Sequence, residues 1–204
     1  LISTISIRYK NKIFKTSYTT PDPIIINSIL KSMVDKGVSH CFMEVSSHGI
    51  NQNRISGLDF YGAVFTNISH DHLDYHKNFK NYLNAKLYLF KKLLKKNSNI
   101  ITDINIPEYK KIKKISLKNK LNLKTIGIKK GHLNIISHQY VDEKQIIKIK
   151  HKNNFYNIEL NLIGKIQIKN LLMAMIAAEK SNIRFKNIIK IISEVKPVSG
   201  RFER

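Results

Sequence analysis

The sequence predicts an α/β fold with a mostly parallel sheet flanked by helices and a small antiparallel subsheet. Short apolar runs at 40–45 and 62–67 follow a helical stretch, and this alternation of helix and strand is typical of parallel sheets. Residues 78–96 form a strongly amphipathic helical pattern. Several short β-type runs separated by polar turns occupy 98–162, which indicates the antiparallel part.

The remaining elements follow from local signals. Residues 5–9 and 12–15 are predicted to be two strands joined by a short turn. The stretch TTPDP at 19–23 is a rigid turn, and the helix that begins at its last proline ends at Gly37. Two further helices are predicted at 168–183 and 185–195, the first of them largely buried.

One lysine lies on the apolar side of the 78–96 helix. Its apolar stripe has a gap at Lys86, three residues after Leu83 and four before Phe90. A lysine there can reach solvent with its amine, which is the common outcome. Alternatively, burial lowers its pKa, and the neutral amine reacts with carbon dioxide to form a carbamate that can hold Mg²⁺. Both alternatives stay open at this point.

Polar groups follow the two predicted parallel strands. Glu44 ends the run at 40–45, and a carboxylate at the carboxyl end of a buried strand suits Mg²⁺ or a pair with a lysine. The segment NISHDHLDYH at 67–76 contains His70, His72 and His76, whose spacing suits neither one helical face nor a zinc finger. One of these histidines could join Glu44 around a magnesium ion.

The segment EVSSHGINQNR at 44–54 gathers hydroxyl, amide and guanidinium groups. Arg54 can bind a phosphate or carboxylate with two parallel hydrogen bonds, and Ser46 and Gln52 can donate to an anionic, sugar-rich ligand. Ordinary loop polarity is the alternative explanation.

Composition excludes several classes of protein. The 204 residues carry a formal net charge of +22, but the lysines are dispersed and no nucleic-acid-binding motif occurs, so we expect no nucleic-acid partner. One cysteine rules out a disulfide framework and a cysteine-rich zinc site. No apolar run approaches the roughly 20 residues that span a bilayer, so we expect no membrane partner. The chain begins without methionine, which suggests a fragment.

Four motifs in order resemble the central domain of the Mur ligases, most closely the UDP-N-acetylmuramoyl-tripeptide synthetases. They are TTPDP at 19–23, MEVSSHGINQNR at 43–54, AVFTNISHDHLDYHKNFKNYLNAKLYLF at 63–90 and SGRFER at 199–204. Such long motifs are highly specific, and together they extend over nearly the whole chain. The resemblance implies that residues 1–204 are one Mur ligase central domain, truncated on its N-terminal side and lacking the C-terminal domain.

The resemblance also assigns roles to residues. It implies that Lys86 is the carbamylated lysine and that the catalytic magnesium ligands are Glu44, His72 and Lys86. It implies contacts to the UDP-muramoyl substrate from Thr19, Thr20, Ser46, Gln52 and Arg54. On the ATP side it implies Asn170, Gln167 and Arg201, with Gln167 standing where the family motif G-x-x-N-x-x-N has its first asparagine.

The implied reaction is ATP-dependent amide formation in the cytoplasm. ATP phosphorylates the D-glutamyl carboxylate of UDP-MurNAc-L-Ala-D-Glu, and the amine of diaminopimelate or lysine displaces the phosphate. A glycine-rich loop of the type G-x-x-G-K-[ST] does not occur in residues 1–204, and we expect it upstream. The amino-acid-binding domain is expected after Arg204, so we expect the chain to be inactive alone and to need these flanking domains as partners.

Three rivals remain. Folylpolyglutamate synthetase is a related ligase, although that family has a glycine-rich stretch where this chain has VSSHGINQNR. A non-catalytic basic module that binds nucleic acid would show steeply salt-dependent binding. A decaying gene product would be folded but without function.

Overall fold

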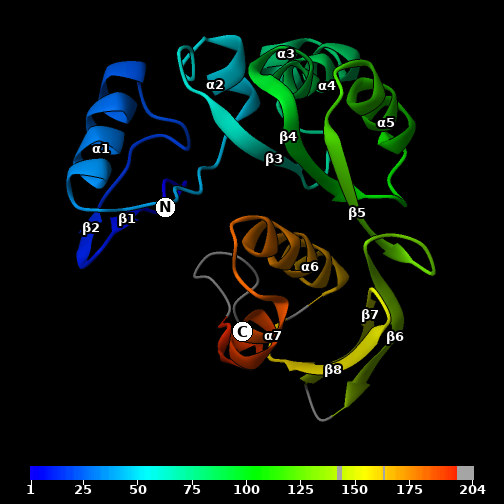
Figure 1. Ribbon diagram of the computed structural model, residues 1–204. Helices are drawn as coiled ribbons and strands as arrows, with labels where there is room; N and C mark the ends of the chain where they lie inside the picture. Colours follow the sequence, from blue (N-terminus) through cyan, green and yellow to red (C-terminus); the bar gives the residue numbers. More distant parts are fainter. Residues whose placement is uncertain (142–143, 163, 197–204) are drawn as a thin grey trace. The chain divides into compact units, whose positions relative to one another are not determined.

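The computed structural model describes residues 1–141, 144–162 and 164–196 (Figure 1). The chain forms two compact units. The first unit comprises Leu1–Phe60 and Ile68–Leu94, and the second comprises Tyr61–Asn67 and Lys95–Arg204. Each unit has a hydrophobic core of its own and is described by itself.

The first unit opens with a hairpin and a helix. Strands β1 (Ile7–Tyr9) and β2 (Lys12–Phe14) pair antiparallel, as the sequence predicts. Helix α1 (Pro23–Asp35) lies beside this hairpin in Figure 1. Asp22 caps α1 by accepting a hydrogen bond from the Ile24 amide, and proline occupies the first helical position, where its missing N–H costs nothing.

The predicted buried strand at 40–45 is wrong. Only Met43 forms a bridge there, with Ile2, and Phe42 is 48% exposed. Two backbone hydrogen bonds, from Ile2 N to Phe42 O and from Glu44 N to Ile2 O, make up this contact. A strand needs a neighbouring strand that continues the ladder of hydrogen bonds. The residues at 40–45 form only this one bridge, so no strand develops.

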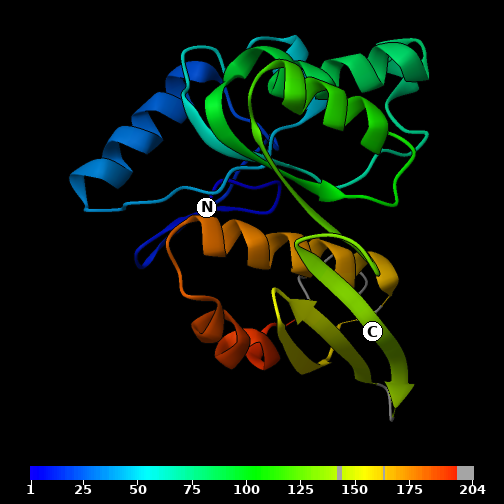
Figure 2. The same cartoon turned by 45° about the vertical axis from the view of Figure 1, so that its right-hand side comes forward.

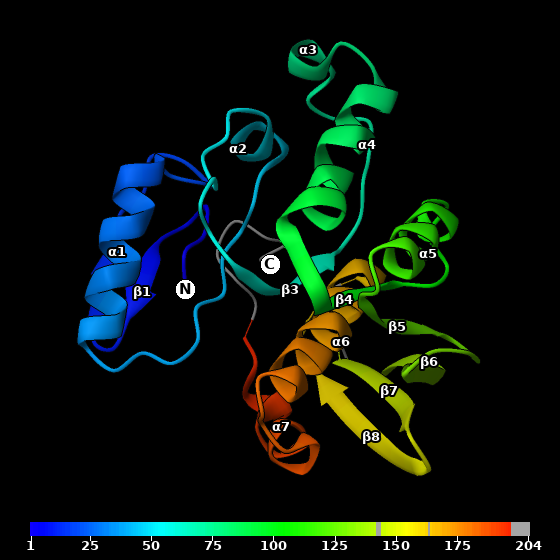
Figure 3. The ribbon, with the colours of Figure 1, turned by 45° about the horizontal axis from the view of Figure 1, so that its top comes forward.

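The rest of the first unit is helical. It consists of α2 (Ser47–Asn51), α3 (Leu73–His76), α4 (Phe79–Tyr88) and a π-helical turn η1 (Leu89–Leu93). Figure 3 shows α3 at the start of α4. The predicted helix at 78–96 is confirmed as far as residue 93, but the helix stops there because Leu94 has extended backbone and begins the next strand.

The second unit is built on a six-stranded sheet. The pairs β4–β5 and β5–β6 are parallel, and β6–β7 and β7–β8 are antiparallel, which confirms the predicted fold class. The strands lie in the order of the sequence: β3 (Phe60–Phe65), β4 (Leu94–Asp103), β5 (Asn122–Ile128), β6 (Leu133–Val141), β7 (Lys144–His151) and β8 (Asn154–Leu160).

The sequence missed one helix of this unit. Residues 98–162 were predicted to form only a subsheet, but α5 (Tyr109–Lys118) connects β4 to the parallel strand β5. Its buried residues Ile112 and Ile115 are three apart, a helical spacing that the surrounding lysines obscure. In Figures 1 and 3, β5 lies between α5 and α6.

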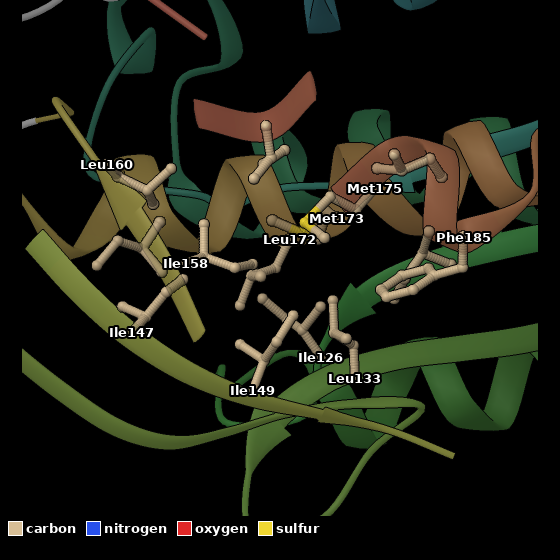
Figure 4. Close-up of a cluster of buried hydrophobic side chains, with 14 of the residues drawn as sticks. Ile126, Leu133, Ile147, Ile149, Ile158, Leu160, Leu172, Met173, Met175 and Phe185 are labelled. Carbon is tan, nitrogen blue, oxygen red and sulfur yellow. The ribbon is translucent and has the colours of Figure 1, made fainter. Parts of the chain in front are cut away.

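The core of the second unit joins the sheet to two helices. Helices α6 (Lys165–Lys180) and α7 (Phe185–Ile191) confirm the predictions for this region, and Figure 2 shows both beside the curved strands β7 and β8. Figure 4 shows side chains of both layers pointing toward one another. The cluster includes Ile126, Leu133, Ile147, Ile149, Ile158, Leu160, Leu172, Met173, Met175 and Phe185. No helix in the described part of the chain is both long and apolar enough to cross a membrane.

Candidate active site

The candidate active site in the first unit begins with Thr20, a fully buried residue. Its hydroxyl accepts a hydrogen bond from the Ser46 amide at 2.9 Å and lies 3.2 Å from the carbonyl oxygen of Glu44. Ser46 in turn caps α2 by accepting from the Gly49 amide at 3.0 Å. The Thr20 hydroxyl therefore holds the loop that enters α2, although the resemblance assigns Thr20 to the substrate.

Gly49 allows this close packing. A Cβ atom added at Gly49 would lie 2.8 Å from Thr20 Cβ and 2.9 Å from both other side-chain atoms of Thr20. The first turn of α2 and the threonine segment can therefore approach this closely only because residue 49 has no side chain.

The carboxylate of Glu44 is held by another part of the same loop cluster. It accepts hydrogen bonds from the Thr4 amide at 2.8 Å and from the Thr4 hydroxyl. The Thr4 and Thr19 hydroxyls are 3.0 Å apart. We use the name loop cluster for Thr4, Thr19, Thr20, Glu44 and Ser46. Its exposed oxygen atoms form a patch of hydroxyl and carboxylate groups at the entry to α2.

Arg54 braces the loop cluster. Its guanidinium donates to the Thr20 carbonyl at 2.9 Å and to the side-chain oxygen of Gln52, and it lies 4.8 Å from the centre of the Tyr18 ring. The Gln52 amide also donates to the Tyr75 hydroxyl at 3.3 Å. The predicted substrate residues Gln52 and Arg54 are thus brought together, and both lie next to the loop cluster.

A group of rings packs against His48 of α2. The ring of His48 is 5.0 Å from His72 and 4.1 Å from Tyr75, measured between centroids. His76 stacks on Tyr82 at 5.2 Å, and the His72 ring meets the edge of Tyr82 at 5.7 Å. We call these five residues, His48, His72, Tyr75, His76 and Tyr82, the ring cluster. It brings α2, α3 and α4 together.

Lys86 lies beside the ring cluster. Its amine is 5.4 Å from the centre of the Tyr82 ring, which is also in contact with His72. Burial lowers the pKa of the Lys86 amine, and the nearby Asp71 carboxylate opposes part of that effect. The Lys86 side chain is half-buried, so its amine is partly removed from solvent. The carbamate alternative requires this loss of solvent.

Burial also lowers the pKa of two histidines of the ring cluster. For His48 and His76 the loss of solvent has the largest effect, and the neighbouring histidines act in the same direction. His76 is 5% exposed, and its Nε2 lies 2.9 Å from the Ser47 hydroxyl. Both imidazoles are therefore biased toward the neutral form.

Donor atoms for a metal are only partly assembled. Across the described residues, no three or more His, Cys, Asp and Glu side chains are gathered closely enough to hold a metal ion. His72 Nε2 lies 3.6 Å from Asp71 Oδ2, and both belong to the segment that faces Lys86. A carbamate on Lys86 would add oxygen donors of the kind that magnesium prefers.

A hollow of about 750 Å³ lies between α2 and the outer side of α4. Its lining is rich in amides and includes Asn51, Asn53, Tyr75, His76, Lys77, Asn81, Asn84 and Tyr88. None of the predicted substrate or metal residues lines it. The hollow therefore neighbours the ring cluster without containing the predicted chemistry.

The predicted ATP-side residues belong to the second unit. Gln167 and Asn170 both lie in the first turns of α6, three residues apart and so on one side of the helix. Arg201 lies outside the described residues. Sequence reasoning considered His76 only as a possible metal ligand, and it gave His48, Tyr75 and Tyr82 no role in the site, although the same motifs contain all four.

Comparison with known proteins shows the family to which the chain belongs. A family model of the Mur ligase middle domain matches residues 1–178. The chain belongs to the Mur ligase family. Its Mur ligase relatives include a UDP-N-acetylmuramoyl-L-alanyl-D-glutamate–2,6-diaminopimelate ligase of Bacteroides fragilis, 36% identical over 206 residues, which cover all of this chain and 40% of the relative. An enzyme of the same name from Chelativorans sp. is 34% identical over 185 residues, which cover 91% of this chain and 38% of the relative.

A solved structure has the same Mur ligase fold. The structure of a UDP-N-acetylmuramoyl-L-alanyl-D-glutamate–2,6-diaminopimelate ligase superimposes with a TM-score of 0.82 and 22% identity, covering 98% of this chain and 42% of that chain. At this identity the match demonstrates the fold alone. The chain spans about 40% of the length of these Mur ligases.

Proposed function

We propose that this chain is the central part of an ATP-dependent amide ligase that joins diaminopimelate to UDP-MurNAc-L-Ala-D-Glu in peptidoglycan synthesis. The observation that carries the proposal is that α2 contacts both the loop cluster and the ring cluster. The predicted substrate residues and the predicted metal residue Glu44 lie at or beside the loop cluster, and the predicted metal residues His72 and Lys86 lie at or beside the ring cluster. The names of the relatives favour diaminopimelate over lysine as the amino acid that is added.

The loop side of α2 supplies the substrate contacts in this proposal. Thr19 and Ser46 present hydroxyl groups, and Arg54 presents a planar guanidinium suited to a phosphate or carboxylate. Arg54 is already oriented by Thr20 and Gln52, so little side-chain freedom is lost on binding. Thr20 acts by holding this arrangement, because its own hydroxyl is buried and already hydrogen-bonded.

The ring side of α2 supplies the cation site. Bound Mg²⁺ would supply positive charge that stabilises a transferring phosphoryl group. His72 and a carbamylated Lys86 would hold it, and Glu44 would place a second ion from the loop side. The lowered pKa of the Lys86 amine supports this assignment, because only a neutral amine reacts with carbon dioxide.

ATP would bind against the second unit in this proposal. The amides of Gln167 and Asn170 would contact the adenine, and Arg201 would contact the phosphates. Because ATP and UDP-linked precursors occur in the cytoplasm, we propose that location for the reaction.

Substrate binding tests the proposal. Isothermal titration should show that the chain binds UDP-MurNAc-L-Ala-D-Glu in preference to folate. Arg54→Met should weaken that binding by about tenfold, the effect of losing a charged hydrogen-bond donor. Arg184→Met is the matched control, because Arg184 precedes α7 in the second unit.

Two results would contradict the proposal. Preference for folate would favour a folylpolyglutamate synthetase. Equal binding by the wild-type chain and Arg54→Met would remove the substrate role of the loop side.

Catalysis is tested by a chimera in which residues 1–204 replace the matching segment of the Bacteroides fragilis relative, with diaminopimelate incorporation as the measurement.

A further inference from the structure

A buried carboxylate lies at the carboxyl end of β4 in the second unit. Asp103 is 1% exposed, and its Oδ1 accepts a hydrogen bond from the Asn105 amide at 2.8 Å. Its Oδ2 lies 2.7 Å from Lys169 Nζ, yet it has no hydrogen bond of normal geometry among the described residues. The distance is short enough for a strong ion pair, so we attribute the missing hydrogen bond to the angle. This oxygen therefore depends on the charge of one ammonium group.

Lys169 belongs to the first turns of α6. It stands between Gln167 and Asn170, and its side chain is 39% exposed. Helix α6 begins after Gly164, which has a φ of +85° and provides no side-chain cap. The Gln167 amide donates to the Gly164 carbonyl at 3.2 Å, but a helix start without a side-chain cap tends to fray. The ion pair to Asp103 joins this helix start directly to the sheet.

A second contact holds the segment that leads into α6. The buried amide of Gln145 on β7 donates to the Leu162 carbonyl, and His138 lies 2.9 Å from the oxygen of the same amide. This contact fixes the chain before Gly164 but does not reach the helical turn. Among the described residues, Lys169 is the charged residue at the start of α6 that pairs with a residue of the sheet, Asp103.

We propose that the Asp103–Lys169 ion pair fixes the first two turns of α6 and thereby positions Gln167 and Asn170 for adenine nucleotide. The identity of the nucleotide rests on the proposed function, whereas the fixing of the helix turns rests on the geometry of the ion pair. Asp103 and Lys169 are positioning residues, since the carboxylate is buried and the ammonium is directed to it. Rotation or fraying of the turn would displace both amides together, because they share one side of the helix.

Hydrogen exchange and nucleotide titration test the two parts separately. Lys169→Met leaves a buried carboxylate without its cation and can unfold the unit, so the double variant Asp103→Asn with Lys169→Met is made as well. The asparagine retains an oxygen for the Asn105 amide and removes the charge. Both variants should exchange the amides of residues 166–172 about tenfold faster and bind MgADP about tenfold more weakly than the wild-type chain.

Two controls separate positioning from general stability. Lys169→Arg keeps the cation and should restore both measurements. Lys144→Met breaks the exposed pair with Glu159 on β7 and β8, and should leave the exchange of residues 166–172 and the MgADP affinity unchanged. A merely structural role would lower the urea midpoint of the double variant without changing either measurement, and that result would overturn the proposal.

The outcomes also distinguish this inference from the proposed function. If the wild-type chain binds MgADP and the double variant binds it equally well, the ion pair has no positioning role and the ligase proposal stands. If MgADP binds neither the wild-type chain nor the chimera, which supplies the flanking segments of the relative, the nucleotide part of both proposals is wrong. Unchanged exchange at residues 166–172 in the double variant overturns the inference in either case.

Discussion

His76 Nε2 lies 2.9 Å from the Ser47 hydroxyl, and this contact joins α3 to the first residue of α2. Both side chains are almost fully buried, at 5% and 4% exposure. Ser47 follows the cap residue Ser46 of the loop cluster, and His76 belongs to the ring cluster. The hydrogen bond therefore connects the two halves of the candidate active site.

Loss of this contact should destabilise the first unit. We expect His76→Ala to lower the free energy of unfolding by about 2–4 kcal/mol, because it leaves a buried hydroxyl unpaired and a cavity beside Tyr82. Urea denaturation followed by circular dichroism measures the change. His70→Ala is the control, since the His70 side chain is exposed and its ring stacks on Phe79. Equal losses in the two variants would contradict the prediction.

The close approach of Gly49 to Thr20 should make position 49 intolerant of a methyl group. Gly49→Ala places a Cβ within 2.9 Å of Thr20 and should cost about 1–3 kcal/mol, since the neighbouring backbone must shift. Gly57→Asn is the control: Gly57 has a φ of +80° but open space around it, and asparagine tolerates that conformation best. Thermal unfolding would disprove the prediction by showing the same midpoint for Gly49→Ala as for the wild-type chain.

Carbamate on Lys86 is directly observable. The chain incubated with ¹³C-bicarbonate should show a carbamate carbon signal by NMR, and Lys86→Met should abolish it. Because burial lowers the pKa of the amine, the signal should grow as pH rises through that lowered pKa and the neutral fraction increases. Lys80→Met, on the exposed side of α4, should retain the signal. A signal that survives in Lys86→Met would assign the modification elsewhere.

The second unit should lose stability in mild acid through His151. This buried residue stacks on Phe185 at 3.8 Å and lies 3.3 Å from Glu179. Burial lowers the pKa of His151 below its ordinary 6.5; Glu179 opposes this effect, whereas Lys152 and Lys180 add to it. The unfolded chain therefore binds more protons, so stability is complete above 6.5 and falls as pH drops toward the folded value.

Variants determine whether His151 causes this loss. Glu179→Gln should deepen the acid loss, because the carboxylate raises the pKa of the imidazole. His151→Gln should reduce the slope of unfolding free energy between pH 7 and 5, measured by urea titration at each pH. His40→Gln changes an exposed histidine and should leave the slope unchanged. A slope that is the same in His151→Gln and in the wild-type chain would contradict the assignment.

Local sequence patterns predicted the elements that their own hydrophobic periodicity identifies. The amphipathic stripe around Lys86 predicted α4, which is observed, and left open whether the amine is exposed or desolvated; burial lowers its pKa. The same reasoning failed at 40–45, where apolar residues look like a strand but only Met43 forms a bridge. It also missed α5, whose lysines outnumber its two buried isoleucines.

Contacts between distant residues could not be predicted in this way. Glu44 was expected at a metal or beside a lysine, yet its carboxylate accepts hydrogen bonds from Thr4, forty residues away. Thr20 was assigned to substrate, yet it holds the loop before α2. No local pattern encodes either partner.

Residue order and side-chain type were enough for the α/β class, the family motifs and the place of Lys86 in the apolar stripe of α4, because these depend on short spacings along the sequence. Three arrangements arise only when elements pack: the ring cluster, the hydrogen bonds from Thr4 to Glu44, and the Asp103–Lys169 ion pair. Each joins residues that lie tens of positions apart along the chain, such as His48 and His72 in the ring cluster, and only the packed backbone determines which side chains come into contact.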